Sequence, residues 1–100
     1  MTQGLALELA PFSINVNAIC PGLLWTSMWE RIAHRWSIDS EKLEGLTPRE
    51  IFDRTIKERI PLGREQTPED IGYLATFLAS DYAENITGQA INVSGGSHMN

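Results

Sequence analysis

The sequence has a single cysteine, Cys20, among its 100 residues, so no disulfide can form within the chain. Proteins of reducing compartments do not rely on disulfides, and we therefore expect a cytoplasmic location. No apolar run is long enough to cross a membrane. The N-terminus lacks the basic segment of a signal peptide, and Glu8 interrupts its only apolar stretch. Neither a secretory signal nor a membrane partner is expected.

Basic residues are also scarce. Eight lysines and arginines stand against 13 acidic residues, which gives a net charge of −5 and a pI near 4.9. This balance argues against nucleic-acid binding. It does not exclude a dinucleotide, because local backbone N–H groups hold such a ligand. His34 has no second histidine or cysteine nearby, so no metal site is expected.

The sequence has the length of one small domain. Its apolar residues repeat with the period of a strand in some segments and with the period of a helix in others. An apolar run at residues 14–20, closed by Pro21 and Gly22, predicts a buried strand. A second strand is predicted at residues 89–94, where Ile91 and Val93 alternate with polar residues. Helices are predicted at residues 2–10, 28–36, 48–60 and 68–80, and a loop with a helical turn at 37–46.

Helix starts are marked by capping residues. Ser27 and Glu30 have the spacing of a capping box and predict a helix from residue 28 onward. Thr47 and Thr67 are each followed by a proline and an acidic first turn, which predicts two further N-caps. The expected apolar residues that face the core are Ile51, Phe52, Ile56 and Ile60 in one helix and Ile71, Leu74, Ala75 and Leu78 in the next.

The order of these elements predicts an α/β fold. Two strands joined through helices are normally parallel, with a right-handed crossover. Two parallel strands alone make a poor sheet, because parallel sheets are normally wider and covered on both faces. The pattern therefore indicates a truncated domain, or one that a partner completes.

The turn after the first strand carries the pattern N-x-x-x-P-G-x-x-x-T-x-M. Its residues are Asn17, Pro21, Gly22, Thr26 and Met28. Four further motifs follow the same order along the chain: LALELA at 5–10, IPLGR and PEDI within 60–71, FLAS at 77–80 and TGQAINVSGG at 87–96. Together they resemble the C-terminal part of short-chain dehydrogenases/reductases, over almost the whole chain apart from its variable middle.

The resemblance implies the C-terminal part of a Rossmann-like, doubly wound parallel sheet, with two parallel strands and flanking helices. Residues 1–100 would form a single partial domain, with residues 28–62 as the variable substrate lid. The implied cofactor is NAD or NADP, and the implied substrate is a small alcohol or ketone of the polyol, diol or 3-oxoacyl type. The family also implies a homo-oligomer, a dimer or tetramer, with residues 71–78 and 89–93 near the contact.

Two hallmarks of that family are missing from the sequence. There is no glycine-rich pyrophosphate turn and no Tyr-x-x-x-Lys pair, since Phe77 follows Tyr73 and Ile86 follows Tyr82 at that spacing. The resemblance places both shortly before Met1. It therefore implies no catalytic residue here and an inactive chain when alone. The alternative is a non-catalytic truncated product, or an oligomerisation or binding module.

The turn after the first strand is the candidate site. A strand that stops at Pro-Gly and opens into a helix N-terminus suits an anionic or carbonyl-bearing ligand. The resemblance implies cofactor contacts at Pro21, Gly22, Leu24 and Thr26. The backbone of Leu24 would serve the nicotinamide carboxamide, and the Thr26 hydroxyl would add a hydrogen bond. An alternative makes Thr26 or Ser27 only an N-cap, and the two roles can coexist.

The tryptophans begin the variable segment. By the resemblance Trp25 and Trp29 line the substrate pocket, but large aromatics at helical spacing also pack in cores, and the two interpretations are equally weighted. Trp36 is expected to pack. Asn17 is expected to be a structural amide that satisfies backbone groups. Ser13 stands where the family usually has glycine, so backbone strain is expected there.

Overall fold

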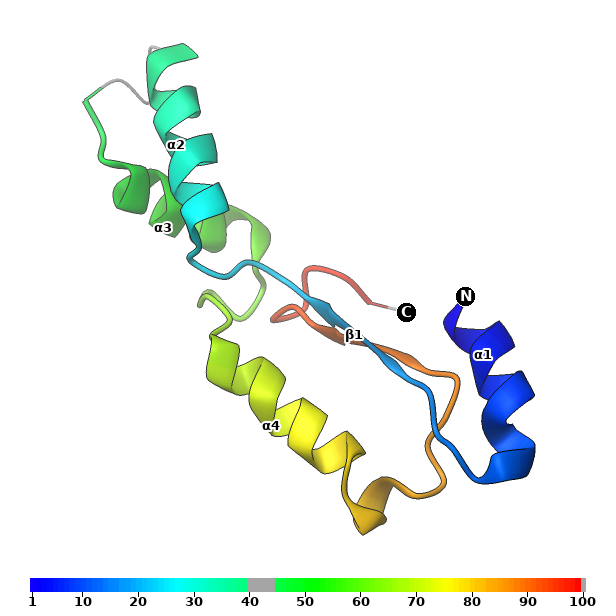
Figure 1. Ribbon diagram of the computed structural model, residues 1–100. Helices are drawn as coiled ribbons and strands as arrows, with labels where there is room; N and C mark the ends of the chain where they lie inside the picture. Colours follow the sequence, from blue (N-terminus) through cyan, green and yellow to red (C-terminus); the bar gives the residue numbers. More distant parts are fainter. Residues whose placement is uncertain (40–44, 100) are drawn as a thin grey trace.

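The computed structural model describes residues 1–39 and 45–99 and shows an elongated molecule of 56 × 22 × 22 Å (Figure 1). Its elements are α1 (Thr2–Leu9), η1 (Ala10–Phe12), β1 (Ala18–Pro21), α2 (Ser27–Asp39), α3 (Pro48–Arg59), α4 (Pro68–Leu78), η3 (Asp81–Ala83) and β2 (Ala90–Val93). All four predicted helices are present. The loop expected at 37–46 is wrong at its start, because α2 continues to Asp39, and residues 40–44 lie outside the described residues.

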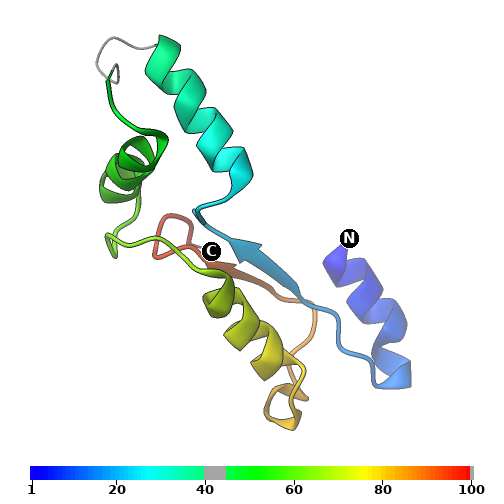
Figure 2. The same cartoon turned by 60° about the vertical axis from the view of Figure 1, so that its left-hand side comes forward.

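The two strands pair in parallel, as predicted. Ala18 lies opposite Ala90 and Pro21 lies opposite Val93. The ladder continues past Pro21, whose ring removes its own N–H, because the N–H of Gly22 donates to the carbonyl of Val93 at 2.8 Å. Helices α1 and α4 lie on opposite sides of this strand pair, and α2 and α3 form one end of the molecule (Figure 2).

The first strand is shorter than the predicted 14–20. Before Ala18 one backbone bond still joins the two segments, from the N–H of Gly88 to the carbonyl of Val16 at 2.8 Å, and side chains make the other bonds. The hydroxyl of Thr87 accepts from the N–H of Val16 at 2.9 Å. The side-chain oxygen of Asn17 accepts from the N–H of Gln89 at 3.1 Å, and its nitrogen donates to the carbonyl of Ile86 at 2.9 Å. The structural role expected for Asn17 is therefore confirmed.

Helix starts confirm two of the three expected caps. Thr47 and Thr67 each form a full capping box, with Glu50 and Asp70 as the reciprocal partners. The prediction for Ser27 is wrong, because Ser27 is already the first residue of α2. The helix begins one residue earlier than expected, and the preceding hydroxyl makes the capping hydrogen bond described below.

The main buried cluster lies where α3 packs against α2, and not on a face of the sheet. Phe52 and Ile56 of α3 form a buried cluster with Ile60, which directly follows the helix, and Leu23 and Trp29 pack against it. The expected apolar face of α3 is confirmed. The face expected for α4 is only partly right, because Ile71, Leu74 and Leu78 are half-buried, Ala75 is exposed and no residue of α4 is fully buried. A sheet of two strands is too narrow to cover that helix (Figure 2).

The link between α1 and β1 contains one strained residue. Ser13 has a φ of 60°, in the left-handed region that favours glycine. This conformation closes η1, where the N–H of Ser13 donates to the carbonyl of Ala10 at 2.9 Å. The strain expected at Ser13 from the sequence is therefore confirmed.

Candidate functional site

The 21–26 turn lies where both strands end. Because β1 and β2 are parallel, Pro21 and Val93 mark their common carboxyl edge, and the turn leads directly into α2. In open α/β sheets, ligands bind outside this edge. The four residues expected to contact a cofactor, Pro21, Gly22, Leu24 and Thr26, are therefore brought together in one turn at the edge where such ligands bind.

The space at position 22 admits only glycine. A β-carbon at this position would lie 2.4 Å from the Oε1 atom of Gln66 and 2.7 Å from the Cα atom of Ser94. Real β-carbons do not approach heavy atoms so closely. Glycine therefore permits a close approach here, and the approaching segments come from residue 66 and from the end of β2.

Gln66 is a structural residue of the site that sequence reasoning missed. Its Oε1 atom accepts from the N–H of Leu23 at 2.9 Å, and its own backbone N–H donates to the carbonyl of Leu23 at 3.0 Å. Its side-chain nitrogen donates to the carbonyl of Arg64 at 3.1 Å, and only 6% of the residue is exposed. A lone glutamine in a polar link has no periodic pattern that would reveal this role.

The remaining polar groups of the turn belong to Leu24 and Thr26. The Thr26 hydroxyl accepts from the N–H of Trp29 at 3.3 Å, the bond of an N-cap, which leaves its own proton able to donate elsewhere. Among the hydrogen bonds of the described residues, none involves the backbone N–H or C=O of Leu24. The turn thus offers one donor and one acceptor side by side on Leu24, with a hydroxyl two residues later.

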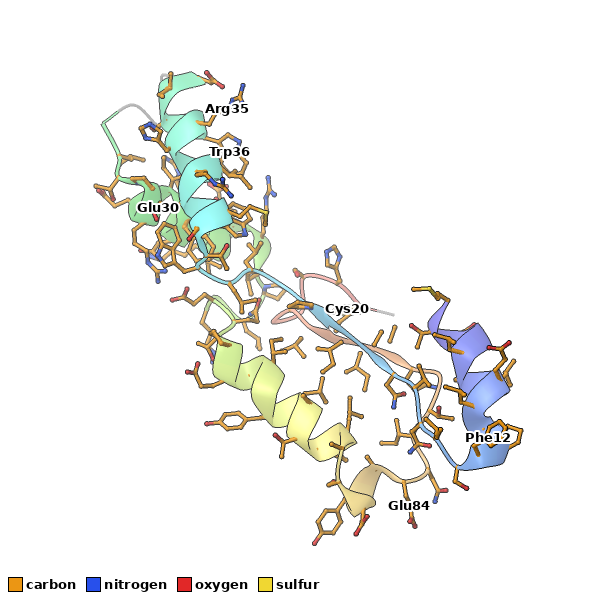
Figure 3. All side chains as sticks on the ribbon, viewed as in Figure 1. Phe12, Cys20, Glu30, Arg35, Trp36 and Glu84 are labelled. Atoms are coloured by element: carbon orange, nitrogen blue, oxygen red, sulfur yellow. The ribbon has the colours of Figure 1, made fainter. Side chains whose placement is uncertain are left out.

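The tryptophans form a continuous aromatic row with Phe52. The ring of Trp29 lies 5.4 Å from that of Phe52 and 5.7 Å from that of Trp36, which projects from α2 (Figure 3). Both contacts have edge-to-face geometry, which is favourable for aromatic pairs. The packing expected for Trp36 is confirmed. Trp25 ends the row, 5.1 Å from Phe52, and is 36% exposed.

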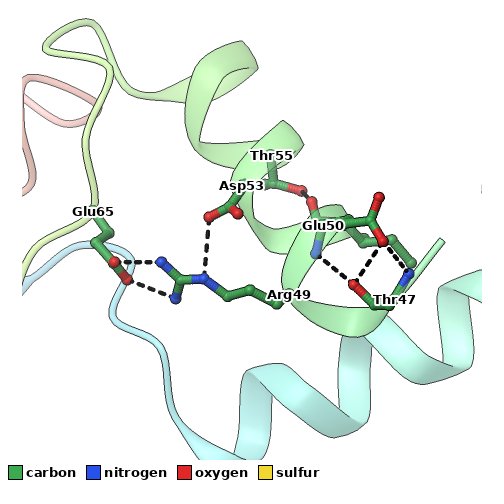
Figure 4. A network of polar contacts seen from close by, with 7 residues as sticks. Thr47, Arg49, Glu50, Asp53, Thr55 and Glu65 are labelled. Atoms are coloured by element: carbon green, nitrogen blue, oxygen red, sulfur yellow. Dashed lines mark hydrogen bonds and ion pairs between the residues drawn. The ribbon is translucent and has the colours of Figure 1, made fainter.

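Arg49 lies between this row and the link between α3 and α4, and Figure 4 shows its contacts with Glu65 and Asp53. Its guanidinium makes two hydrogen bonds to the carboxylate of Glu65, one of them at 3.1 Å, and an ion pair with Asp53 at 3.2 Å. The hydrogen bonds with Glu65 raise the pKa of Arg49 above its usual range. The same guanidinium lies 5.2 Å from the ring centre of Trp25. Sequence reasoning missed this network, because its partners are 16 residues apart.

Other kinds of site find no support in the described residues. Within residues 1–39 and 45–99, no group of three histidine, cysteine, aspartate or glutamate side chains could hold a metal ion. The same part of the chain has no helix with the length and apolar character needed to cross a membrane. Cys20 is a free, half-buried thiol on β1 (Figure 3).

The parallel strand pair, its covering helices and the turn at its carboxyl edge define a Rossmann-type α/β protein. A family model described as enoyl-(acyl carrier protein) reductase matches residues 1–98. The chain belongs to the short-chain dehydrogenase/reductase family, whose members use NAD or NADP. The family resemblance of the sequence motifs is thereby confirmed.

Two curated relatives and one solved structure illustrate the similarity. The diacetyl reductase [(S)-acetoin forming] of Staphylococcus epidermidis is 44% identical over 95 residues, which cover 95% of this chain and 35% of that protein. The galactitol 2-dehydrogenase of Agrobacterium fabrum is 42% identical, over 98% of this chain and 36% of that protein. The crystal structure of L-sorbose reductase from Gluconobacter frateurii, complexed with NADPH and L-sorbose, has a TM-score of 0.85 and 29% identity, over 99% of this chain and 36% of that one. The chain therefore spans about a third of the length of the proteins it matches.

Proposed function

We propose that this chain is the C-terminal portion of an NAD(P)-dependent oxidoreductase that interconverts an alcohol and a ketone. In this proposal residues 1–100 are a single partial domain, which supplies the nicotinamide contacts and, with residues 28–62, the substrate lid. The observation that carries the proposal is the 21–26 turn, which presents Leu24 and Thr26 at the carboxyl edge of a parallel sheet. We call the complete protein that would contain this chain the parent.

The chemistry of the turn fits the nicotinamide end of the cofactor. A carboxamide has an NH2 donor and a C=O acceptor, and the free C=O and N–H of Leu24 are their complements. The Thr26 hydroxyl can donate a further hydrogen bond while it caps α2. Gly22 and Pro21 bring the backbone close to the ligand without a protruding polar side chain. The cofactor, when bound, supplies the hydride chemistry.

The lid supplies the substrate side. Trp25 and Trp29 would line an apolar pocket wall next to the 21–26 turn, in line with their places in the aromatic row. The similarity to a diacetyl reductase and a galactitol 2-dehydrogenase supports a small diol or polyol substrate, and the similarity to a 3-oxoacyl-[acyl-carrier-protein] reductase supports a 3-oxoacyl one. The chain itself offers no Tyr-x-x-x-Lys pair, so the proton must come from another part of the parent.

Location and assembly complete the proposal. We expect the parent in the cytoplasm, as a homo-oligomer that is a dimer or a tetramer. The exposed side of α4 supports a contact there, because Tyr73 is 73% exposed and Phe77 is 39% exposed. The alternative, a non-catalytic truncated product or an oligomerisation or binding module, would present the same exposed surface. Sequencing the coding region upstream of Met1 separates the two, since an in-frame Tyr-x-x-x-Lys and glycine-rich turn would support the enzyme.

The direct test is turnover by the parent. Purified parent is assayed for NADH and NADPH oxidation with diacetyl, a ketose and a 3-oxoacyl thioester, and the Trp25→Ala and Trp29→Ala variants are assayed beside it. We expect turnover with at least one carbonyl substrate, and a change in substrate preference in the variants that exceeds any change in cofactor affinity. A folded parent that binds neither nucleotide would contradict the proposal. Equal losses for all substrates, with lower thermal stability, would reduce both tryptophans to packing.

A further inference from the structure

The ion pair between Arg49 and Glu65 differs from the others in the described residues. The pairs Arg35–Asp39, Arg49–Asp53 and Arg54–Glu58 each join residues four apart on one helix. Arg49 and Glu65 instead join the first turn of α3 to the link before α4, with two parallel hydrogen bonds (Figure 4). The Arg49 and Glu65 side chains are 42% and 31% exposed, and the Glu65 value is the lowest of any partner in these four pairs. Two-point pairing fixes the guanidinium in direction as well as in position.

The fixed guanidinium lies against Trp25. Its central carbon is 5.2 Å from the centre of the Trp25 ring, within the range of a cation–π contact. Phe52 is fully buried on α3, the helix that also carries Arg49. Its ring centre lies 5.1 Å from that of the Trp25 indole. The indole of Trp25 therefore rests on two residues of α3, although Trp25 itself belongs to the turn before α2.

Glu65 stands next to the residue that fixes the turn. Gln66 makes backbone and side-chain hydrogen bonds to both polar groups of Leu23, at 3.0 and 2.9 Å. Glu65 and Gln66 thus connect the two parts of the site. Gln66 holds the backbone of the 21–26 turn. Glu65 holds the guanidinium of Arg49, which lies over Trp25.

We propose that Arg49 is a positioning residue, which is held by Glu65 and fixes the Trp25 indole as a wall of the substrate pocket. The substrate role of Trp25 rests on the proposed function. The positioning of the indole by Arg49 can be measured separately. Lysine should not replace Arg49, because an ammonium group can neither pair bidentately with a carboxylate nor cover an indole with a planar group.

The first measurement is fluorine NMR of the parent labelled with fluorotryptophan, with resonances assigned by single Trp→Phe variants. The variants are Arg49→Gln, Arg49→Lys and Glu65→Gln, and the control is Arg54→Gln, which removes an exposed arginine from the same helix. We expect the Trp25 resonance to shift and broaden in all three test variants and to stay unchanged in the control. An unchanged Trp25 resonance in Arg49→Gln would overturn the proposal whether or not the parent is an oxidoreductase.

The second measurement is steady-state kinetics on the same variants, with a Trp25→Ala background. Arg49→Gln should raise KM for the carbonyl substrate about tenfold, the equivalent of one lost charge-assisted contact, with kcat and the KM for cofactor nearly constant. In the Trp25→Ala background the same substitution should add almost nothing, because a residue that acts through Trp25 has no further effect once the indole is gone. Additive losses, or full rescue by Arg49→Lys, would contradict a positioning role. A parent that turns over no substrate would refute the proposed function, and the NMR result would still decide the positioning.

Discussion

The Oε1 atom of Gln66 lies 2.4 Å from the point where a β-carbon on Gly22 would stand. The same oxygen accepts the hydrogen bond from the N–H of Leu23 at 2.9 Å. It can therefore not retreat from Gly22 without leaving a backbone donor unpaired. The glycine at residue 22 leaves the space that the Gln66 amide fills when it binds the Leu23 N–H. Substitution of either residue tests this relationship.

Gly22→Ala should lower the free energy of unfolding of the parent by about 1–3 kcal/mol, the usual cost of overpacking. The new methyl group would also meet the Cα atom of Ser94 at 2.7 Å, and that backbone atom cannot rotate away. Urea unfolding measures the change. Gly4→Ala is the matched control, because a β-carbon on this residue of α1 meets nothing within 4 Å and alanine favours helix. Equal stability of Gly22→Ala and the wild type would refute the close approach.

Gln66→Leu should lower the free energy of unfolding by about 1–3 kcal/mol, since it leaves the N–H of Leu23 without its acceptor. Gln66→Glu keeps an acceptor oxygen but should also destabilise, because it places an unpaired carboxylate at a 6% exposed position, beside the carbonyl of Arg64. Gln3→Leu, on the exposed side of α1, is the control. Urea unfolding combined with amide exchange at Leu23 checks the prediction. Fast exchange at Leu23 in the wild type would contradict it.

The parts of the fold that the sequence predicted are those with local causes. Thr47 and Thr67 carry their capping partners three residues ahead, so each helix start is encoded within one turn of chain. The burial of Phe52 and Ile56 follows from spacing along a single helix. The strained conformation of Ser13 likewise follows from its place in the family pattern, where glycine is usual.

The parts that the sequence missed depend on partners far along the chain. The strand predicted at residues 14–20 is too long. Its first residues instead make hydrogen bonds that involve the side chains of Asn17 and Thr87, between segments about 70 residues apart. Gln66 and Arg49 belong to no periodic pattern, and their roles arise only when α3 and the following link fold beside the 21–26 turn. The buried face expected for α4 failed because burial depends on the width of the sheet beneath it.

Thr26→Ala should lower both the stability and the cofactor affinity of the parent. The loss of the cap on the Trp29 N–H costs about 1 kcal/mol, and the loss of a hydroxyl donor to the cofactor costs a similar amount. Thr26→Ser keeps the hydroxyl and should preserve both quantities. Thermal unfolding and nucleotide titration separate the two effects. Lower stability with unchanged affinity in Thr26→Ala would leave Thr26 as a cap alone.

The 100-residue chain alone should show no dehydrogenase activity. It contains no Tyr-x-x-x-Lys pair to donate a proton to the carbonyl oxygen of a substrate. Its two tyrosines, Tyr73 and Tyr82, are both exposed. Purified chain is assayed with NADH and NADPH at high protein concentration, beside a preparation from cells that carry the empty vector. Turnover above that background would show that the family chemistry can proceed without the pair.

The isolated chain should associate with itself or melt without cooperativity. Its buried cluster belongs to α3, whereas α4 has no fully buried residue and leaves Tyr73 and Phe77 exposed. In the described residues β1 pairs only with β2, so its other edge presents unpaired backbone groups, which are prone to pair with another chain. Light scattering combined with thermal melting tests this on the 100-residue chain. Phe77→Lys should reduce association by placing a charge on the exposed side of α4, whereas Lys57→Arg on α3 should leave it unchanged. A monodisperse monomer with a cooperative melt would show instead that α2 and α3 suffice to stabilise the chain.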